Sequence, residues 1–401
     1  MIVFKVNSFP QVSETFVVSN IIETIKEGFR VKLIVDEKNR LEDSSQKELL
    51  ELYNFSNFIY HFSPPKGKMI RLFISLFYLL NPLLFYFFVK YWRLIKKTSL
   101  FYIFVLKFYK NFRNVDVFHV HFAPTSHPLL DLKAIGYIKS KIIVTFHGYD
   151  AHFLPKGQEL KHLIQKYKKF VDEITVNSDY LKNKLVQKGF SESHITIVPI
   201  GIDSSFFKRE QSISMIKSKP FKLITVGRLL PLKGQYLGIQ VVKILKDKGY
   251  DIQYTLVGDG DELEKLQKIV DQLNLHESVT FVGVKNQAEV KLMLEASDVF
   301  LMTSTNDKYD RAEAFGIVSL EAQAMGLPVI GFNSGGFPDT LIDGITGFLV
   351  EDKNINAMSS EVEKLINNPN LLSSISENAI KHVRENFDLK ITNKKYTDLY
   401  R

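Results

Sequence analysis

The sequence predicts an α/β protein with two domains, each built around a doubly wound parallel sheet. Segments with strand and helix patterns alternate along the 401 residues. The strand candidates are near-continuous runs of Val, Ile and Leu, as strands that are covered on both faces require. The alternation stops at a polar stretch, 201–219, and then restarts. Repeated strand–helix units favour parallel sheets, so we expect two Rossmann-like domains of similar size.

The individual elements follow from the same patterns. The first half contains strand candidates at 2–6, 31–35, 117–121, 142–146, 174–176 and 195–198, with helices near 15–27 and 178–188. The second half contains strand candidates at 221–226, 254–257, 279–282, 299–302 and 328–331. We therefore predict domains at 1–205 and 206–385, and a C-terminal helix at 386–401 that packs back toward the first domain. Ligands of such sheets bind outside the carboxyl ends of the strands, so two facing domains predict an interdomain cleft.

Composition excludes several classes of protein. Hydrophobic residues make up 45% and charged residues 24%, which is typical of globular proteins and not of disordered or collagen-like chains. The chain has no cysteine, so disulfides and thiolate nucleophiles are excluded and a reducing compartment fits. The first residues, MIVFKVN, lack the regions of a signal peptide. We expect a cytoplasmic protein.

The positive charge is concentrated in one segment. The chain carries 52 basic and 44 acidic residues, a net charge of +8. Residues 61–115 contain ten Lys or Arg and no Asp or Glu, so this segment contributes +10 and the remainder −2. Within it, 72–89 is an uncharged apolar run of eighteen residues, the lower limit for a spanning helix. Asn81-Pro82 interrupts this run, which predicts two shorter helices.

Aromatic side chains beside Lys and Arg suit the headgroup region of a membrane. We therefore expect residues 66–113 to form a helical segment that faces an anionic membrane surface at the inner face of the cell membrane, as a peripheral attachment. The residues expected to face the membrane are Lys90, Trp92, Arg93, Lys96 and Lys97. Two alternatives remain open from the sequence, namely core helices with a solvated basic rim, and a true transmembrane helix.

Two glutamates in the second half predict a nucleotide-sugar site. Glu313 and Glu321 are eight residues apart, about 12 Å at a helical rise, which matches a sugar–diphosphate–ribose unit. The helix is expected to begin near 315–316, so its first amides would face an anion at the positive end of the helix dipole. These amides belong to Gly316, Ile317 and Val318. The alternative is a pair of surface glutamates on a solvated helix.

A basic loop follows the strand 221–226. Its sequence, VGRLLPLKG, places a glycine at the turn and two cations, Arg228 and Lys233, five residues apart. Fixed cations can compensate a pyrophosphate leaving group, the main electrostatic demand of transfer from a nucleotide donor. The alternative is that both are loop residues in water.

These motifs together carry a resemblance. GRLLPLKG, VGDGDE, FVG, the Glu313/Glu321 spacing and GLPVIGFNSGGFPD, between about 199 and 385, resemble the retaining GT-B glycosyltransferases of family 4, glycosyl transferases group 1. In the first half HFAPTSHP, TFHGYD and IVPIGID match more loosely. The opening FPQVSETF is similar to the subset that acts in capsule, exopolysaccharide and colanic-acid-like synthesis.

The resemblance implies roles for single residues. Arg228 and Lys233, with the amides named above, would hold the donor diphosphate, and Glu321 the ribose hydroxyls. Glu313 would contact the donor sugar beside Phe315, and His147 would lie near the reacting oxygen, so that Glu313 and His147 are the expected catalytic residues. The loop near the nucleotide base would contain the following residues: Gly258, Gly260 and Val282.

The implied reaction moves a sugar from a nucleoside-diphosphate sugar, with UDP favoured, to a glycan acceptor that we expect to be lipid-linked. Anomeric configuration would be retained, with no cofactor and no protein-bound metal, in cell-surface polysaccharide synthesis. No nucleic-acid partner is expected. Two alternatives stay open: a non-catalytic GT-B binding module recruited to the membrane, and a GT-B nucleotide-sugar epimerase.

The sequence departs from the family at its first loop. Many relatives have a Gly-Gly turn there, whereas this chain has Ser8-Phe9-Pro10 and then Ser13-Glu14-Thr15. Ser13 and Glu14 are expected to bind acceptor or donor, or else to cap the following helix. His119 and His121, on the strand 117–121, are expected to face opposite sides of the sheet, so no metal site is predicted there.

Overall fold

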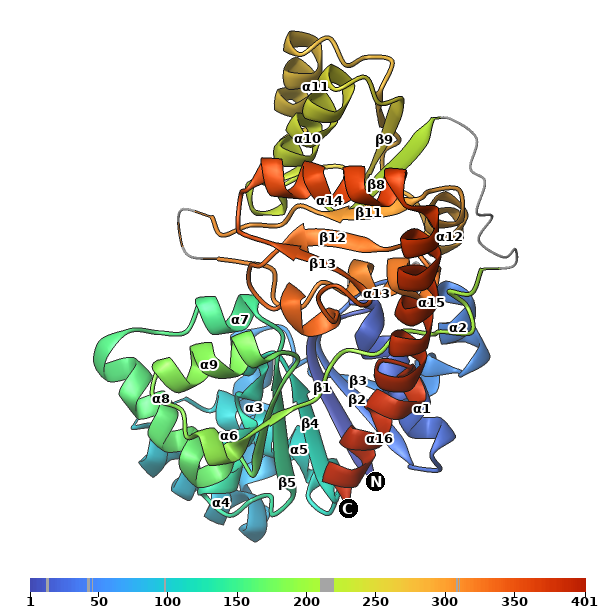
Figure 1. The fold of residues 1–401 in the computed structure, drawn as a ribbon. Helices are drawn as coiled ribbons and strands as arrows, with labels where there is room; N and C mark the ends of the chain where they lie inside the picture. The colour runs from blue at the N-terminus through green and yellow to red at the C-terminus, as the bar shows by residue number, and fades with distance from the viewer. Residues whose placement is uncertain are drawn as a thin grey trace. The chain divides into compact units, whose positions relative to one another are not determined.

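The computed structural model describes residues 1–11, 14–41, 44, 46–96, 99–209, 220–307, 309 and 311–401 (Figure 1). The chain divides into two compact units. The N-terminal unit contains residues 1–176, 182–198 and 395–401, and the C-terminal unit contains 177–181 and 199–394. Ser13, Lys97 and residues 210–219 of the predicted linker lie outside the described residues.

The N-terminal unit is built on a parallel sheet of seven strands in the order β3-β2-β1-β4-β5-β6-β7. The strands are β1 (Ile2–Phe9), β2 (Val31–Lys38), β3 (Ile59–His61), β4 (Val117–His121), β5 (Lys141–Phe146), β6 (Glu173–Val176) and β7 (Ile195–Ile197). From β1 the order runs outward in both directions, to β2 and to β4. Such a switch point is where doubly wound sheets place their ligands.

Helices connect the strands of this unit. They are α1 (Thr15–Lys26), α2 (Lys47–Leu52), α3 (Lys68–Leu79), α4 (Pro82–Ile95), α5 (Phe101–Tyr109), α6 (Leu129–Ala134), α7 (Tyr149–His152), α8 (Gly157–Phe170) and α9 (Asp179–Gln187). The predicted break of the apolar run is confirmed, because Asn81 caps α4 by accepting from the amides of Leu83 and Leu84, each at 3.1 Å. Pro82 takes the first helical position, where its missing N–H costs nothing.

The C-terminal unit has a parallel sheet of six strands in the order β10-β9-β8-β11-β12-β13. The strands are β8 (Phe221–Val226), β9 (Ile252–Val257), β10 (Val279–Phe281), β11 (Val299–Met302), β12 (Val329–Phe332) and β13 (Gly347–Val350). The helices are α10 (Gln235–Asp247), α11 (Leu263–Gln272), α12 (Gln287–Glu295), α13 (Ile317–Ala324), α14 (Ile355–Asn367), α15 (Pro369–Asn386) and α16 (Leu389–Tyr400).

Both faces of this second sheet are covered. Leu223 of β8 packs in a core cluster with residues of α10 and α14. The next residue, Ile224, packs in a separate cluster with residues of α12 and α13. This alternation explains why the strands read as continuous apolar runs.

Two predicted details differ from the structure. β3 and β13 were not predicted, because each has only three or four residues and lies at a sheet edge. The predicted tail helix at 386–401 is the short helix α16, preceded by the end of α15. Residues 395–401 of α16 belong to the N-terminal unit, where Tyr396 and Tyr400 are part of the core.

Candidate functional site

The loop after β8 is held by the loop after β9. The amides of Gly227 and Leu229 donate to the carbonyls of Val257 and Asp259, each at 2.9 Å. A Cβ on Gly258 would lie 2.1 Å from the Gly227 carbonyl oxygen, and one on Gly260 would lie 2.4 Å from that of Leu229. Both glycines are thus required by close backbone packing, and their predicted role at the nucleotide base stays a prediction.

Lys233 and Glu313 form an ion pair between this loop and the loop before α13. Both side chains are largely buried, with 20% and 17% of their surface exposed. Thr303 fixes the backbone of Lys233 by donating to its carbonyl at 2.7 Å. Arg228, on the same loop as Lys233, is exposed. The structure therefore brings together two residues that the sequence assigned to the donor diphosphate and the donor sugar.

The backbone of Glu313 is fixed by a glycine turn that the sequence analysis missed. The Gly336 amide donates to the Glu313 carbonyl at 2.8 Å. A Cβ on Gly335 would lie 2.2 Å from that same oxygen, and Gly335 has a φ of +62°. The letters SGG in GLPVIGFNSGGFPD are the sequence signal from which this turn could have been predicted.

The N-terminus of α13 lies next to this pair in the chain. Gly316 is the N-cap residue, in the left-handed region with a φ of 92°, and Ile317 and Val318 are the first two helical residues. Amides at these positions have no acceptor within the helix and are available to an anion. Glu313 precedes the helix, so the predicted 12 Å helical spacing to Glu321 does not apply. Between the two glutamates only the part from Ile317 to Glu321 is helical, a rise of about 6 Å.

The other predicted residues of this unit have distinct environments. Burial raises the pKa of Glu321 to about 8, so its carboxyl group is mostly protonated at neutral pH. Phe315 is buried in the core of the unit, with its ring 6.0 Å from that of Phe387. Val282 is partly exposed and follows β10, and its neighbour Gly283 accepts a hydrogen bond from the Gly258 amide at 2.9 Å. Val282 and Gly258 are therefore close, as expected for one loop cluster.

In the N-terminal unit, His147 follows β5 in a turn that Asp150 organises. The Asp150 carboxylate accepts from the amides of His147 at 3.0 Å, Gly148 at 3.1 Å and Ala123 at 2.9 Å. Burial raises the pKa of Asp150 and these hydrogen bonds oppose the rise. The aspartate of TFHGYD therefore holds the loops after β4 and β5 together, a role that sequence reasoning did not assign.

His147 is paired with a second histidine. His121 Nδ1 lies 3.0 Å from His147 Nε2, and the two rings are stacked with an interplanar angle of 9°. Burial lowers the pKa of His121 to about 3 and that of His147 well below its usual value, so both rings are neutral at neutral pH. One of the two must therefore donate the hydrogen bond. His121 Nε2 and His147 Nδ1 are buried without a partner among the described residues.

The predicted orientation of His119 was wrong. Residues two apart on a strand share a face, and the rings of His119 and His121 lie 4.4 Å apart. The nitrogens of His119 are occupied by Tyr400 Oη at 2.6 Å and Thr145 Oγ1 at 2.7 Å. Within the described part of the chain no group of three or more His, Asp or Glu is arranged to hold a metal ion.

Glu14 immediately precedes α1, whose Phe16 contacts His147. Glu14 occupies the predicted N-cap position, but its side chain makes no capping hydrogen bond, and Ser13, the other candidate, lies outside the described residues. Burial raises the pKa of Glu14 to about 7. Phe16, two residues later, packs on His147 with ring centroids 4.6 Å apart.

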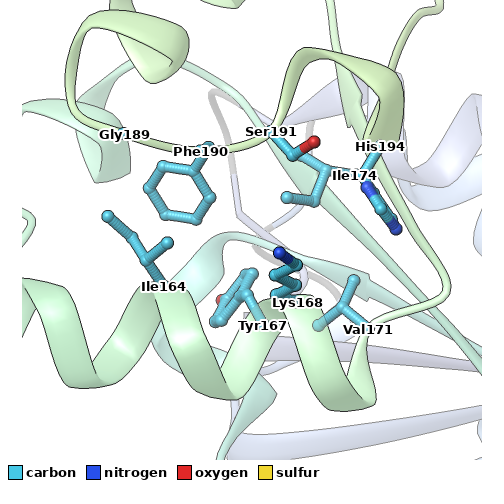
Figure 2. Close-up of a pocket in the computed structure, with 9 residues that line it drawn as sticks. All are labelled: Ile164, Tyr167, Lys168, Val171, Ile174, Gly189, Phe190, Ser191 and His194. Carbon is cyan, nitrogen blue, oxygen red and sulfur yellow. The ribbon is translucent and has the colours of Figure 1, made fainter.

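A separate pocket of about 110 Å³ lies between α8 and the segment 189–194 (Figure 2). Its wall includes Tyr167, Lys168, Phe190 and His194, and Ile174 at the start of β6. It therefore lies at the amino end of β6, whereas His121 and His147 lie at the carboxyl ends of β4 and β5. None of the predicted site residues lines it.

Comparison with known families gives the chain an identity. The model of Glycosyltransferase Family 4 matches residues 13–206, and the model of Glycosyl transferases group 1 matches residues 206–382. Together they cover nearly the whole chain. The chain belongs to glycosyltransferase family 4. This family 4 glycosyltransferase carries Lys233, Glu313, Gly316 and Glu321 in the second match and His147 in the first.

Its relatives include several proteins with names from polysaccharide synthesis. It is 27% identical to WcaL of Salmonella typhimurium, named for colanic acid biosynthesis, over 71% of this chain and 70% of that protein. It is 26% identical to AmsK of Erwinia amylovora, named for amylovoran biosynthesis, over 62% of this chain and 61% of that protein.

Solved structures resemble the whole glycosyltransferase. HepE of Anabaena, in complex with UDP, has a TM-score of 0.73 at 19% identity, over 99% of this chain and 98% of that one. A glycosyltransferase of Rickettsia africae has a TM-score of 0.72 at 19% identity, over 100% and 97%. These likenesses, with two parallel sheets flanked by helices, confirm the predicted GT-B fold.

Proposed function

We propose that this glycosyltransferase moves a sugar from a nucleoside-diphosphate sugar, UDP-linked, to a glycan acceptor in cell-surface polysaccharide synthesis, with retention of configuration. The observation that carries the proposal is the Lys233–Glu313 ion pair, three residues before the N-cap of α13. A cation, a carboxylate and free helix amides are then close in one unit. This combination suits a diphosphate joined to a sugar.

The ion pair suggests how the donor is accommodated. Without donor, Glu313 balances the charge of Lys233. A donor diphosphate offers Lys233 a stronger partner, aided by Arg228 and the amides of α13. Glu313 is then released to accept hydrogen bonds from sugar hydroxyls, while Glu321 faces the ribose. The site thus exchanges one charge pair for another and leaves no buried charge without a partner.

The chemistry follows from stabilisation of the leaving group. The bond from the anomeric carbon to the diphosphate oxygen breaks while the acceptor oxygen bonds to the same face of that carbon. The acceptor proton passes to the departing phosphate oxygen. Lys233, Arg228 and the α13 amides would stabilise the charge that develops on the diphosphate, without a cofactor or a metal. His147 would be placed beside the reacting oxygen as a neutral hydrogen-bonding group.

Donor and pathway are supported by the similar proteins. HepE structures are described as complexes with UDP and with UDP-glucose. Other relatives are named for colanic acid, amylovoran and capsular polysaccharide biosynthesis. A lipid-linked glycan at the cytoplasmic face of the cell membrane would be a suitable acceptor in such pathways. The basic segment 61–115 supports a peripheral position of the enzyme at this membrane face.

The test is donor hydrolysis and transfer with purified protein, across UDP-glucose, UDP-galactose, UDP-N-acetylglucosamine and GDP-mannose. Lys233→Ala and Glu313→Ala are expected to lower turnover about 100-fold or more, because each removes a group that acts on the donor. Lys248→Ala, which breaks the Lys248–Glu363 pair elsewhere in the same unit, is the control. Wild-type turnover in both site variants would overturn the proposal, as would an epimerised nucleotide sugar formed without acceptor.

A further inference from the structure

Helix α3 exposes most of its large apolar side chains, which is unusual for a globular protein. An ordinary surface helix buries its apolar stripe and exposes its polar residues. In α3 the buried residue is Ser75, while Phe73 and Phe77 are 65% and 69% exposed and Leu80, after its end, is 77% exposed. The remaining exposed large apolar residues of the helix are Met69, Ile70, Leu72 and Leu76.

The inner face of α3 mixes polar and apolar groups, and Ile74 and Tyr78 on it are half-buried. Ser75 Oγ and Arg71 Nε are buried without a hydrogen-bond partner among the described residues. α3 packs on α5, whose Ile103, Phe104 and Leu106 are buried. The packing against α5 therefore fixes the orientation of α3. If α3 rotated to bury its exposed apolar side chains, it would lose this packing.

Helix α4, which follows α3 directly, also exposes large apolar side chains. Leu84, Phe87 and Tyr91 point inward and are buried. The opposite side exposes Leu83, Phe85, Tyr86, Trp92 and Leu94. Aromatic side chains bury about 150–250 Å² each when covered, so the two helices together present on the order of 1000 Å² of apolar surface. Monomeric proteins rarely leave a patch beyond about 300–600 Å².

Geometry and charge indicate what covers this face. α3 and α4 together are long and apolar enough to cross a membrane, but they are bent by 114° at the break. Among the described residues no single helix is long and apolar enough to cross one. α3, with 12 residues, is about 18 Å long, against about 30 Å for a hydrocarbon core. Basic residues surround the pair, and no acidic residue occurs from 61 to 115.

We propose that the elbow of α3 and α4 inserts into one leaflet of an anionic lipid bilayer. This deepens the membrane position in the proposed function, and it changes which residues make the contact. Lys90, predicted to face the membrane, donates to the Ile135 carbonyl at 3.2 Å and lies over the ring of Tyr86 at 5.0 Å. Trp92, Arg93 and Lys96 are exposed, and their contact with a membrane stays a prediction. The inserted residues are the apolar ones of α3 and the start of α4, with Phe73, Phe77 and Leu80 deepest.

The cysteine-free chain allows a direct test. Phe77→Cys, labelled with an environment-sensitive nitrobenzoxadiazole probe, is mixed with vesicles of phosphatidylcholine and phosphatidylglycerol. We expect a blue shift, with stronger quenching by lipids that carry the quencher at carbon 5 than at carbon 12. Leu292→Cys is the matched control, since Leu292 is 64% exposed on α12 of the other unit. An unshifted Phe77 probe on vesicle-bound protein would overturn the proposal.

A second measurement separates insertion from charge attraction. Phe73→Ser with Phe77→Ser removes exposed side chains, so the fold should persist by circular dichroism, and vesicle binding should fall about tenfold or more. Arg93→Gln with Lys96→Gln should weaken binding mainly at low salt. Equal vesicle binding by the serine variant, or a lipid-free dimer that the serine changes abolish, would contradict lipid insertion.

The two proposals can fail separately. Phe73 and Phe77 lie in the N-terminal unit, outside the donor residues, so donor hydrolysis in solution should be unchanged in the serine variant. Loss of vesicle binding with intact hydrolysis supports both proposals. If the protein inserts into vesicles but hydrolyses no donor, the insertion of the elbow is supported and the proposed enzymatic activity is contradicted.

Discussion

Lys233 and Glu313 show how a binding site can be stable before its ligand arrives. Each is about four-fifths buried, and each is the other's ionic partner. Removing one leaves a largely buried charge without compensation. We expect Lys233→Met and Glu313→Gln each to lower the free energy of unfolding by about 1–3 kcal/mol.

The double variant distinguishes this account from two independent effects. If the residues act as a pair, Lys233→Met with Glu313→Gln should cost clearly less than the sum of the single changes. Urea unfolding of all four proteins measures the coupling. Strict additivity would show that the ion pair contributes nothing in solution.

The buried histidines predict a pH dependence of stability. The folded pKa of His121 is lowered to about 3, and those of His119 and His147 lie well below their usual value. Below about pH 6.5 the unfolded chain therefore binds more protons, and the free energy of unfolding falls as the pH falls, by up to about 1.4 kcal/mol per unit for each group.

Variants isolate this effect from other groups. Glu14 and Glu321 have raised pKa values and contribute in the opposite direction, losing stability as the pH rises above about 4.5. His121→Gln should flatten the slope between pH 5 and 6.5, measured by urea unfolding. His162→Gln, at an exposed position on α8, is the control. Equal slopes in wild type and His121→Gln would contradict burial of a neutral ring.

At the scale of elements, the turn at Gly335 determines where Glu313 lies. A methyl group there would lie 2.2 Å from the Glu313 carbonyl oxygen, so Gly335→Ala must move the loop. Gly344→Ala is a matched control, because Gly344 has a similar positive φ of +72° and open space around it. We expect Gly344→Ala to lose about 1 kcal/mol of stability from backbone strain and Gly335→Ala to lose more, because the clash adds to the strain. Only Gly335→Ala should weaken UDP binding, by about tenfold. Isothermal titration with UDP decides, and equal affinities would contradict the role of the turn.

Much of the fold could be predicted because the information is local. A run such as FKLITV specifies a buried strand wherever it lies, and β8 matches its predicted bounds. Asn81-Pro82 likewise predicts a helix start from adjacent residues. β3 and β13 were missed because short edge strands depend on the neighbours that pair with them.

The site needed information that is not local. Lys233 and Glu313 are 80 residues apart, and no spacing rule links them. His121 meets His147 only through the β4–β5 register, in which His121 pairs with Thr145. The helical-rise argument for Glu313 failed because Gly316, in a left-handed conformation, starts the helix after the glutamate. The motifs singled out Lys233 and Glu313, which the structure brings together, but they did not predict how the two residues are arranged.

At the scale of the whole molecule, the last residues of the chain complete the first unit. α16 begins in the C-terminal unit, and residues 395–401 belong to the N-terminal one. Tyr396 and Tyr400 are buried there, and Tyr400 bonds His119 at 2.6 Å and packs edge-on against Phe4 at 6.4 Å. The core of the N-terminal unit therefore depends on residues that lie far from it in the sequence.

Deleting residues 395–401 should therefore destabilise the N-terminal unit selectively. Removal of two buried tyrosines from a packed core costs on the order of 3 kcal/mol or more, and it leaves His119 without its Tyr400 partner. Hydrogen exchange should become faster in β1 and β4, while β8 and β11 keep their protection, because these strands lie in the other unit. Deletion of Arg401 alone, which is exposed, is the control. Tyr400→Phe should show a milder loss of about 1–2 kcal/mol, since it removes the hydrogen bonds of the buried hydroxyl, including that to His119, and keeps the ring. Unchanged exchange in β1 and β4 after the seven-residue deletion would mean that the core of the first unit closes without the C-terminal turn.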